Sequence, residues 1–352
     1  MTLRFLSGLL CAASMTFAAS VNMPAGKVDI KSAGALAFGP DGILFVGDSV
    51  GATIVALDVD DRTPGRSGGS LEIKGINEKI AAMLGTAADQ ILMQDVVVNP
   101  ISKNVYISVS RGRGADAVPV ILRADAAGKL TEVPLQNIKH SSVALPDSPT
   151  ETKQRMETIT SLKYADGRVF VAGLSNEEFS SSLRSIPFPF QAADKGTGIE
   201  IWHGSHGRFE TQAPVRTFVP YEINHKTSIL AAYTCTPLVT IPVSELKSGN
   251  KVKGTTIAEL GNRNKPLDMI VYTKGGKHFI LMANSSRGVM KLSGDNLEGF
   301  APITKQTEVT GVPYETIASL KGVQHLDKFD DSNALVLMGD SGSLDLRTVP
   351  LP

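Results

Sequence analysis

The chain has 352 residues, of which 42% are hydrophobic, and its 33 Gly and 19 Pro are typical of a turn-rich globular protein, not of a disordered one. Lys and Arg together number 35, as do Asp and Glu, so the net charge of +0 argues against nucleic acid or an anionic membrane as the main partner. Beyond the N-terminus no apolar stretch is long enough to span a bilayer, and we expect no membrane span.

The N-terminus predicts a secretory signal over residues 1–20. Arg4 supplies the positive start, Phe5–Ala13 is a short apolar core, and Ala18–Ser20 offers small residues for cleavage. The apolar core is too short for a stable membrane helix. We therefore expect an exported protein, periplasmic or secreted, whose remaining residues, 21–352, form a single domain.

The first recurring unit of the chain is Ala35–Ser49. Leu36 and Phe38 alternate with small residues, which is the period of a half-buried strand. The turn residues Gly39–Gly42 follow, and Ile43–Val46 is a second short apolar strand. The unit therefore predicts a β-hairpin.

The same pattern returns five times along the chain. Its second strands begin near residues 43, 105, 169, 229, 279 and 335, a period of about 50 to 64 residues. Such a period with several short strands per unit predicts an all-β fold, a six-bladed β-propeller. The alternatives are a seventh, degenerate blade between Gly198 and Val243, a β-sandwich, or two unrelated β domains. The five further copies are Val96–Val109, Leu162–Gly173, Glu222–Cys235, Met269–Asn284 and Leu326–Ser341.

Propellers often close by pairing an N-terminal strand with the last blade. We expect Val28–Ile30 to pair beside Leu344–Val349, which would remove an exposed sheet edge. A frayed terminus is the alternative.

Two short helical insertions are expected. Ile76–Leu84 has apolar residues at helical spacing and ends at Gly85. Ser175–Phe190 begins with a capping box, Ser175 with Glu178, and predicts a second helix. This second helix is either a lid over one mouth of the channel or a cover for an apolar surface patch.

The first candidate site is a metal site of His203, His206 and Cys235. The histidines lie in a Gly-rich turn between two expected strands, Gly198–Trp202 and Arg208–Thr211. Imidazole and thiolate together suit zinc or copper. The alternative is that the histidines lie at the rim and that Cys235 is a buried, inert thiol.

The second candidate site is the mouth of the central channel, where residues that lead into the innermost strands converge. Carboxylates and amides gathered there suit a hard cation such as Ca²⁺, which could polarise an ester or lactone carbonyl. The alternative is that these groups cap strand ends and bind channel waters. The candidates are Asp95, Glu157, Asn264, Asp268 and His325.

The repeat units A-L-A-F-G-P-D-G-I-L-F-V-G-D-S and S-L-K-Y-A-D-G-R-V-F-V-A-G resemble those of six-bladed propellers of the NHL and gluconolactonase-like kind. The resemblance implies the fold, and its families include lactonases, lyases and binding scaffolds. Gluconolactonase-like enzymes use a Glu, Asn and Asp set around a divalent cation. By residue type, Glu157, Asn264 and Asp268 are the counterparts that the resemblance implies.

Two hypotheses for function follow. In the first, an exported, monomeric propeller binds a small molecule or a protein partner, with or without a divalent cation (Ca²⁺, Zn²⁺ or Cu²⁺). In the second, a cation-dependent lactonase or esterase works in the channel. No serine nucleophile elbow, phosphate-binding loop or haem-attachment spacing is present, and the lone Trp202 offers no stacking platform for nucleic acid.

Overall fold

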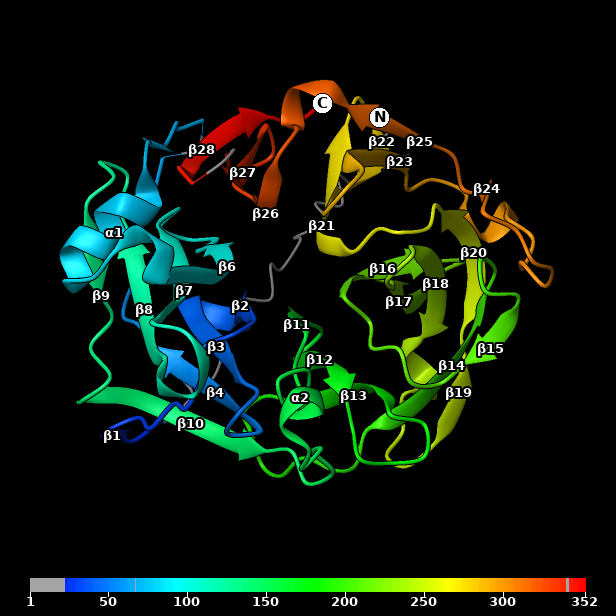
Figure 1. The fold of residues 1–352 in the computed structure, drawn as a ribbon, viewed down its shortest axis with the longest axis horizontal. Helices are drawn as coiled ribbons and strands as arrows, with labels where there is room; N and C mark the ends of the chain where they lie inside the picture. The colour runs from blue at the N-terminus through cyan, green and yellow to red at the C-terminus, as the bar shows by residue number, and fades with distance from the viewer. Residues whose placement is uncertain (1–22, 67, 340–341) are drawn as a thin grey trace, which may run out of the picture.

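Six β-sheets arranged in a ring make up the protein (Figure 1). The computed structural model describes residues 23–66, 68–339 and 342–352, so the expected signal segment at 1–20 lies outside the described residues. Each sheet is one blade, and the strands nearest the central axis are β2, β6, β11, β16, β21 and β26. The prediction of a six-bladed, all-β propeller is confirmed, and a two-sheet sandwich is excluded.

We number the blades by the order of their innermost strands along the chain. Blade 1 contains β1 (Ala25–Gly26), β2 (Leu36–Phe38), β3 (Ile43–Asp48), β4 (Thr53–Asp58) and β10 (Ile138–Ala144). Blade 2 contains β6 (Ile91–Val98), β7 (Val105–Arg111), β8 (Val118–Ala124) and β9 (Leu130–Glu132). Blade 3 contains β11 (Ser161–Ala165), β12 (Arg168–Leu174), β13 (Ser181–Pro187), β14 (Thr197–His203), β15 (Arg208–Glu210) and β19 (Lys251–Lys253).

The remaining three blades follow the chain to its C-terminus. Blade 4 contains β16 (Thr217–Ile223), β17 (Lys226–Ala232), β18 (Pro237–Pro242), β20 (Thr255–Leu260) and β24 (Val309–Gly311). Blade 5 contains β21 (Pro266–Lys274), β22 (Lys277–Asn284), β23 (Gly288–Ser293) and β25 (Tyr314–Ile317). Blade 6 contains β26 (Val323–Lys328), β27 (Asn333–Met338), β28 (Asp345–Pro350) and β5 (Glu72–Ile73). Residues 198–243 are thus divided between blades 3 and 4 and form no seventh blade.

The first hairpin shows how the local sequence makes a blade. Leu36 pairs with Val46 and Phe38 with Leu44. In the turn between them, Asp41 has a φ of 52° and Gly42 a φ of 72°. These left-handed conformations are ones that Gly and, less readily, Asp tolerate, and so the Pro-Asp-Gly sequence fixes the turn.

The blades do not follow one another around the ring in sequence order. The innermost strand of blade 1, β2, contacts β6 of blade 2 and β11 of blade 3, while β6 also contacts β26 of blade 6. The order around the ring is therefore blade 2, 1, 3, 4, 5 and 6, as Figure 1 shows. The chain leaves blade 1 after β4, builds blade 2, and returns to add β10 to the edge of blade 1.

The hydrophobic core consists of six clusters, each lying between two neighbouring blades. Phe45 and Ile54 of blade 1, for example, pack with Leu162 and Val171 of blade 3. Leu346 of blade 6 packs with Val109 of blade 2 in another such cluster. Because every blade buries both faces against its neighbours, no blade has a core of its own.

The ring closes through a different strand from the one that the sequence predicted. Leu346 and Arg347 of β28 pair with Ile73 and Glu72 of β5. Val28–Ile30 forms no strand, and the N–H of Val28 donates to the carbonyl of Leu135 near the edge of blade 1. The prediction for Val28–Ile30 was wrong because the chain crosses to blade 6 only after β2, β3 and β4 of blade 1.

One of the two predicted helical insertions is confirmed. Helix α1 (Ile76–Leu84) ends at Gly85, which has a φ of 65°. The second predicted helix, within Ser175–Phe190, was wrong: the middle of that segment is β13 (Ser181–Pro187), which pairs along β12 as the third strand of blade 3. Pairing with β12 satisfies its backbone groups and overrides the local helical pattern. The other helix of the described residues is the short α2 (Thr152–Arg155), which the side chain of Glu151 caps.

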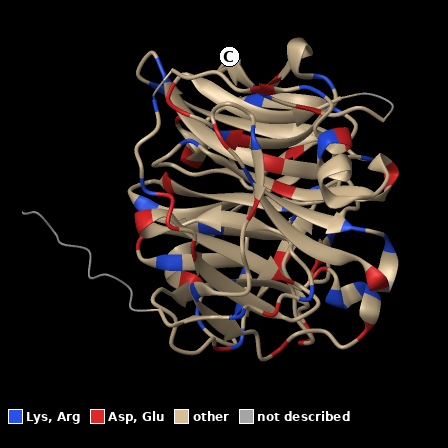
Figure 2. Ribbon diagram, turned by 90° about the vertical axis from the view of Figure 1, so that its left-hand side faces the viewer, with Lys and Arg blue, Asp and Glu red and all other residues tan. Residues whose placement is uncertain are grey.

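The side of the molecule shown in Figure 2 has no large positively or negatively charged patch, because basic and acidic residues are interspersed over the blades. This agrees with the net charge of +0. Among the described residues, no helix has the length and apolar character needed to cross a membrane.

Candidate functional site

Three of the predicted channel residues meet on the innermost strands of blades 2, 5 and 6. Asp95 lies on β6, Asp268 on β21 and His325 on β26, and their ligand atoms all lie within 4.8 Å of one another. Nδ1 of His325 is 3.1 Å from Oδ2 of Asp268 and 3.8 Å from Oδ1 of Asp95. We call these three residues the channel cluster.

The carboxylates of the channel cluster also join neighbouring blades. Asp95 accepts the backbone N–H of Leu36 in blade 1 at 2.7 Å. Asp268 accepts the N–H of Leu326 in blade 6 at 3.0 Å. Asp327, which the sequence reasoning missed, does the same with Val98 of blade 2 at 2.8 Å. Each of these side chains therefore fastens one innermost strand to the next.

Burial and charge act together on the channel cluster. Burial, and then the negative charge of Asp268, raise the pKa of Asp95 to about 7. Burial opposes the charged form of His325, but its hydrogen bond to Asp268 and the charges of both carboxylates outweigh burial and raise its pKa. Nδ1 of His325 thus occupies the place between the carboxylates that a cation would need, and this geometry favours a structural role for the channel cluster.

The other two channel candidates hydrogen-bond elsewhere. Oε1 of Glu157 lies 2.6 Å from Nη1 of Arg216, ahead of the innermost strands β11 and β16. Asn264 is buried and donates to Oδ1 of Asn284 at 2.8 Å. The Glu157, Asn264 and Asp268 set that the family resemblance implied is thus held by three separate groups of partners.

The predicted residues His203, His206 and Cys235 come together between blades 3 and 4, and their ligand atoms all lie within 4.8 Å of one another. We call them the His–Cys cluster. The predicted hairpin is present, since His203 at the end of β14 pairs with Arg208 at the start of β15. Cys235 comes from the turn between β17 and β18 and is a free thiol.

A carboxylate that the sequence reasoning missed lies behind the two histidines. Glu210 holds Nδ1 of His203 with Oε2 and Nδ1 of His206 with Oε1, both at 2.7 Å. Burial alone would raise the pKa of Glu210, but hydrogen bonds from the two histidines outweigh it and lower that pKa to about 2. Glu210 follows Arg208 by two residues in β15, so the two-residue period of a strand places both on the face of the hairpin that carries His203.

A second buried carboxylate fastens the turn of the same hairpin. Oε1 of Glu259, on β20, accepts the backbone N–H of Gly204 at 2.5 Å. Its other oxygen is buried and has no hydrogen-bond partner among the described residues. Burial raises the pKa of Glu259 to about 7.

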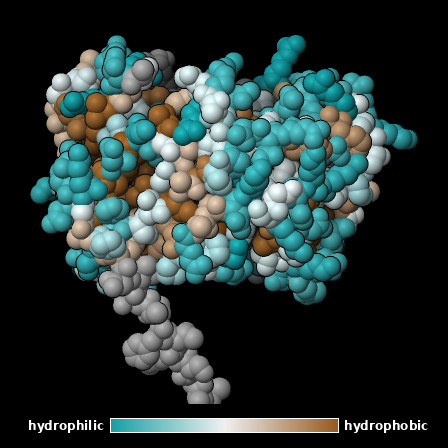
Figure 3. Space-filling view, turned by 90° about the horizontal axis from the view of Figure 1, so that it is seen from below, coloured by the Kyte–Doolittle hydropathy of each residue, from teal (hydrophilic) through white to brown (hydrophobic). Residues whose placement is uncertain are grey.

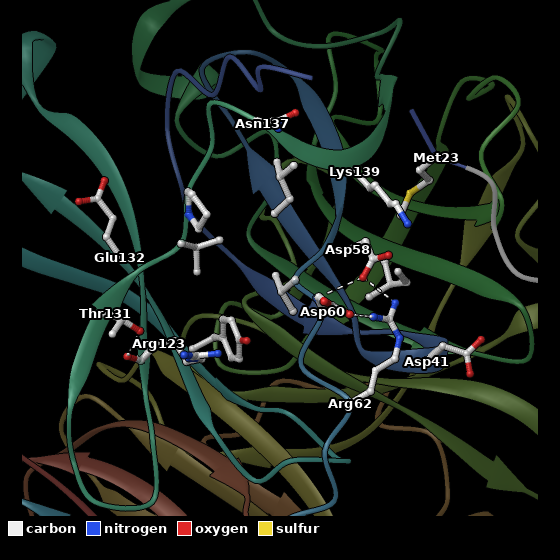
Figure 4. A pocket seen from close by; sticks show the side chains of 16 residues that line it. Met23, Asp41, Asp58, Asp60, Arg62, Arg123, Thr131, Glu132, Asn137 and Lys139 are labelled. Atoms are coloured by element: carbon white, nitrogen blue, oxygen red, sulfur yellow. Dashed lines mark hydrogen bonds and ion pairs between the residues drawn. The ribbon is translucent and has the colours of Figure 1, made fainter. Parts of the chain in front are cut away.

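A large cleft opens between blades 1 and 2, at a place that the sequence reasoning did not anticipate (Figure 4). Its volume is about 1070 Å³, and we call it the blade 1–2 cleft. It lies where the chain passes from β9 of blade 2 to β10 of blade 1. The lining residues used below are Ile43, Asp58, Val59, Asp60, Arg62, Arg123, Thr131, Ile138 and Lys139.

Known proteins resemble this chain only distantly. No family model and no curated protein matches the chain. Among solved structures, the chain is similar to the PQQ-bound aldose sugar dehydrogenase of Streptomyces coelicolor, at 13% identity, a TM-score of 0.32, and 93% of this chain and 96% of that one covered. It is also similar to a streptogramin B lyase structure, at 10% identity, a TM-score of 0.36, and 94% and 98% covered.

Likenesses with TM-scores this low support no assignment, and the class of the protein rests on its own six sheets. It is a six-bladed β-propeller, as the resemblance of its repeat units implied. A propeller of this kind is compatible with a binding or an enzymatic role.

Proposed function

We propose that this protein is an exported ligand-binding propeller that takes an amphipathic small molecule with an anionic group into the blade 1–2 cleft. The observation that supports this proposal is the cleft itself, whose volume of about 1070 Å³ is comparable with that of small-molecule sites. The channel cluster is a weaker candidate for the ligand-binding site, because its polar atoms already bind one another and the neighbouring backbone. Export is inferred from the N-terminal sequence alone.

The lining of the cleft suggests an apolar body for the ligand. Ile43, Val59 and Ile138 contribute apolar surface between the two blades. Seen from below in Figure 3, apolar side chains gather in a hollow on the left, the side on which β1 and β10 lie in Figure 1. Burying such a surface under a ligand is favourable at about 25 cal/mol per Å² of apolar area.

The charges that line the cleft are mixed, with Asp41, Asp58, Asp60 and Glu132 facing Arg62, Arg123 and Lys139. The anionic end of the proposed ligand is assigned to Arg123. Arg62 is already neutralised by Asp58 at 2.5 Å and Asp60 at 2.8 Å. Arg123 and Lys139 also line the cleft, and neither forms an ion pair within the described part of the chain. Figure 4 shows Arg123 next to Thr131 on the blade 2 side of the cleft. A guanidinium group can hold a carboxylate or sulfonate through two parallel hydrogen bonds.

A titration with 8-anilinonaphthalene-1-sulfonate, an apolar ring system with one sulfonate, tests the proposal. We expect saturable binding of one dye molecule, followed by its fluorescence, and displacement by dodecanoate more readily than by neutral dodecanol. Arg123→Gln should weaken dye binding by about tenfold or more, because a hydrogen bond to a charged group contributes about 1.5–3 kcal/mol. Thr131→Trp should weaken it further by filling the cleft.

The matched control is Arg208→Gln, which removes an exposed arginine on blade 3. Dye binding should be unchanged in this variant. Binding that is not saturable, or that responds equally to Arg123→Gln and Arg208→Gln, would overturn the proposal.

A further inference from the structure

The His–Cys cluster has one buried ring nitrogen that the protein leaves without a partner. His203 is only 2% exposed, and its Nε2 makes no hydrogen bond among the described residues. A buried polar atom left unpaired costs about 1–3 kcal/mol. We propose that the His–Cys cluster is a transition-metal site that takes Zn²⁺ through His203, His206 and Cys235. The site lies away from the blade 1–2 cleft, so this inference stands independently of the proposed function.

The hairpin brings the two imidazoles together. The carbonyl of His203 accepts the N–H of His206 at 3.2 Å and of Gly207 at 2.9 Å, so the chain turns back on itself directly after β14. Gly207 takes a φ of 64°, which suits glycine. As a result the two ring centroids lie 3.9 Å apart.

Glu210 leaves one free nitrogen on each imidazole. Because an ionised carboxylate only accepts hydrogen bonds, Nδ1 of His203 and Nδ1 of His206 each donate a proton to it. The lone pair of each neutral ring then lies on Nε2. A carboxylate behind a metal-binding histidine commonly fixes the tautomer in this way and strengthens the ligand.

The thiol arrives from blade 4 on a turn with unusual backbone angles. Cys235 has a φ of 63° and Thr236 a φ of 55°. Left-handed conformations of non-glycine residues cost about 1–3 kcal/mol each and persist only where surrounding contacts hold them. Here the N–H of Cys235 donates to the carbonyl of Asn264 at 2.7 Å, and Oγ1 of Thr236 donates to that of Gly261 at 2.7 Å.

Two imidazoles and a thiolate match the ligand preferences of Zn²⁺, which is usually four-coordinate. The three protein ligands leave one position for solvent, which has access because the His206 side chain is 43% exposed and Cys235 is half-buried. Binding displaces the thiol proton, since the thiolate is the ligand.

The experiment uses the mature protein, stripped of metal with EDTA and kept reduced, and titrates it with Co²⁺ as a spectroscopic probe. We expect one Co²⁺ per chain and a charge-transfer band from a thiolate–cobalt bond, which Zn²⁺ then displaces. Zn²⁺ should also raise the melting temperature, because an ion that binds only the folded state stabilises it by mass action.

Four variants assign the ligands. Cys235→Ser should abolish the charge-transfer band, and His206→Ala should lower the Co²⁺ affinity at least a hundredfold while the fold is retained, because His206 lies at the surface. Glu210→Gln, which alters a positioning residue, should lower the affinity by about 10–100-fold. His225→Ala removes an exposed histidine from the turn between β16 and β17 and should change nothing.

Three results would overturn the inference: no saturable Co²⁺ uptake by the folded protein, a band that survives Cys235→Ser, or an affinity that His206→Ala and His225→Ala lower equally. A metal ion that is lost in Asp268→Asn but retained in His206→Ala would place the ion at the channel cluster instead. Circular dichroism of each variant separates loss of a ligand from loss of the fold.

Discussion

Glu259 is a buried acid whose protonation should control the stability of the propeller between pH 5 and pH 8. It is 0% exposed, it holds the N–H of Gly204 through one oxygen, and it leaves the other oxygen unpaired. Burial raises its pKa from 4.5 to about 7. The folded protein therefore retains a proton that the unfolded chain loses above pH 4.5, and folding becomes less favourable as the pH rises from about 4.5 to about 7.

In the variant Glu259→Gln the side chain at position 259 carries no charge at any pH, so this variant should not lose stability in that way as the pH rises. A pKa difference of about 2.5 units corresponds to about 3 kcal/mol once the pH exceeds both values. Between pH 5 and pH 8, the free energy of unfolding of Glu259→Gln should rise relative to wild type by about 2.5 kcal/mol.

Urea unfolding of both proteins at the two pH values, in EDTA, measures this difference. The single tryptophan, Trp202, lies on β14 beside the hairpin and reports unfolding by its fluorescence. Glu245→Gln, at an exposed position of blade 4, is the control and should show no such rise. If the difference in free energy of unfolding between Glu259→Gln and wild type is the same at pH 5 and pH 8, Glu259 does not titrate in this range and the reasoning fails.

Three further predictions concern the channel and the closure of the ring. Asp268→Asn should lower the free energy of unfolding by about 1.5–3 kcal/mol, because it removes a charge-assisted hydrogen bond from the partly buried His325. This loss of stability should be fully present below pH 6.5 and shrink as the pH rises through the raised pKa of His325. A loss that does not depend on pH in urea titrations would contradict this. Leu346→Ala should lower the free energy of unfolding by about 2–5 kcal/mol. Val309→Ala, at an exposed site, should change it by less than about 0.5 kcal/mol. Equal losses in the two variants would show that β28 does not stabilise the closed ring. Purified protein with added Ca²⁺ should not hydrolyse lactone or ester substrates, and turnover that Asp268→Asn abolishes would restore the channel hydrolase hypothesis.

The repeat along the chain was sufficient to predict six blades, because each hairpin is encoded locally. The turn at Asp41 and Gly42 needs residues that tolerate a positive φ, and the flanking alternation sets the strand period. The order of the blades is not local information. Nothing in the sequence of Ile138–Ala144 shows that it returns to blade 1, because a strand's pattern specifies which face is buried and not which edge it joins.

The candidate sites show the same difference between features that the local sequence encodes and features that depend on how distant segments pack. The proximity of His203 and His206 follows from a hairpin that the sequence predicts, whereas the approach of Cys235 depends on the packing of blade 4 against blade 3. The blade 1–2 cleft exists because β9 and β10 belong to different blades. No pattern in the sequence predicts a cavity of that origin.

The placement of blade 1 between blades 2 and 3 has a consequence for a chain that is still being made or exported. The outer edge of β4 stays unpaired until residues 138–144 have been synthesised. The N–H of Gly75 donates to Asp345, 270 residues later in the chain, so the last blade cannot close before that residue is present. Until then these edges can pair with strands of other chains. A truncated product that ends anywhere before β28 should thus aggregate and not persist as a smaller folded protein.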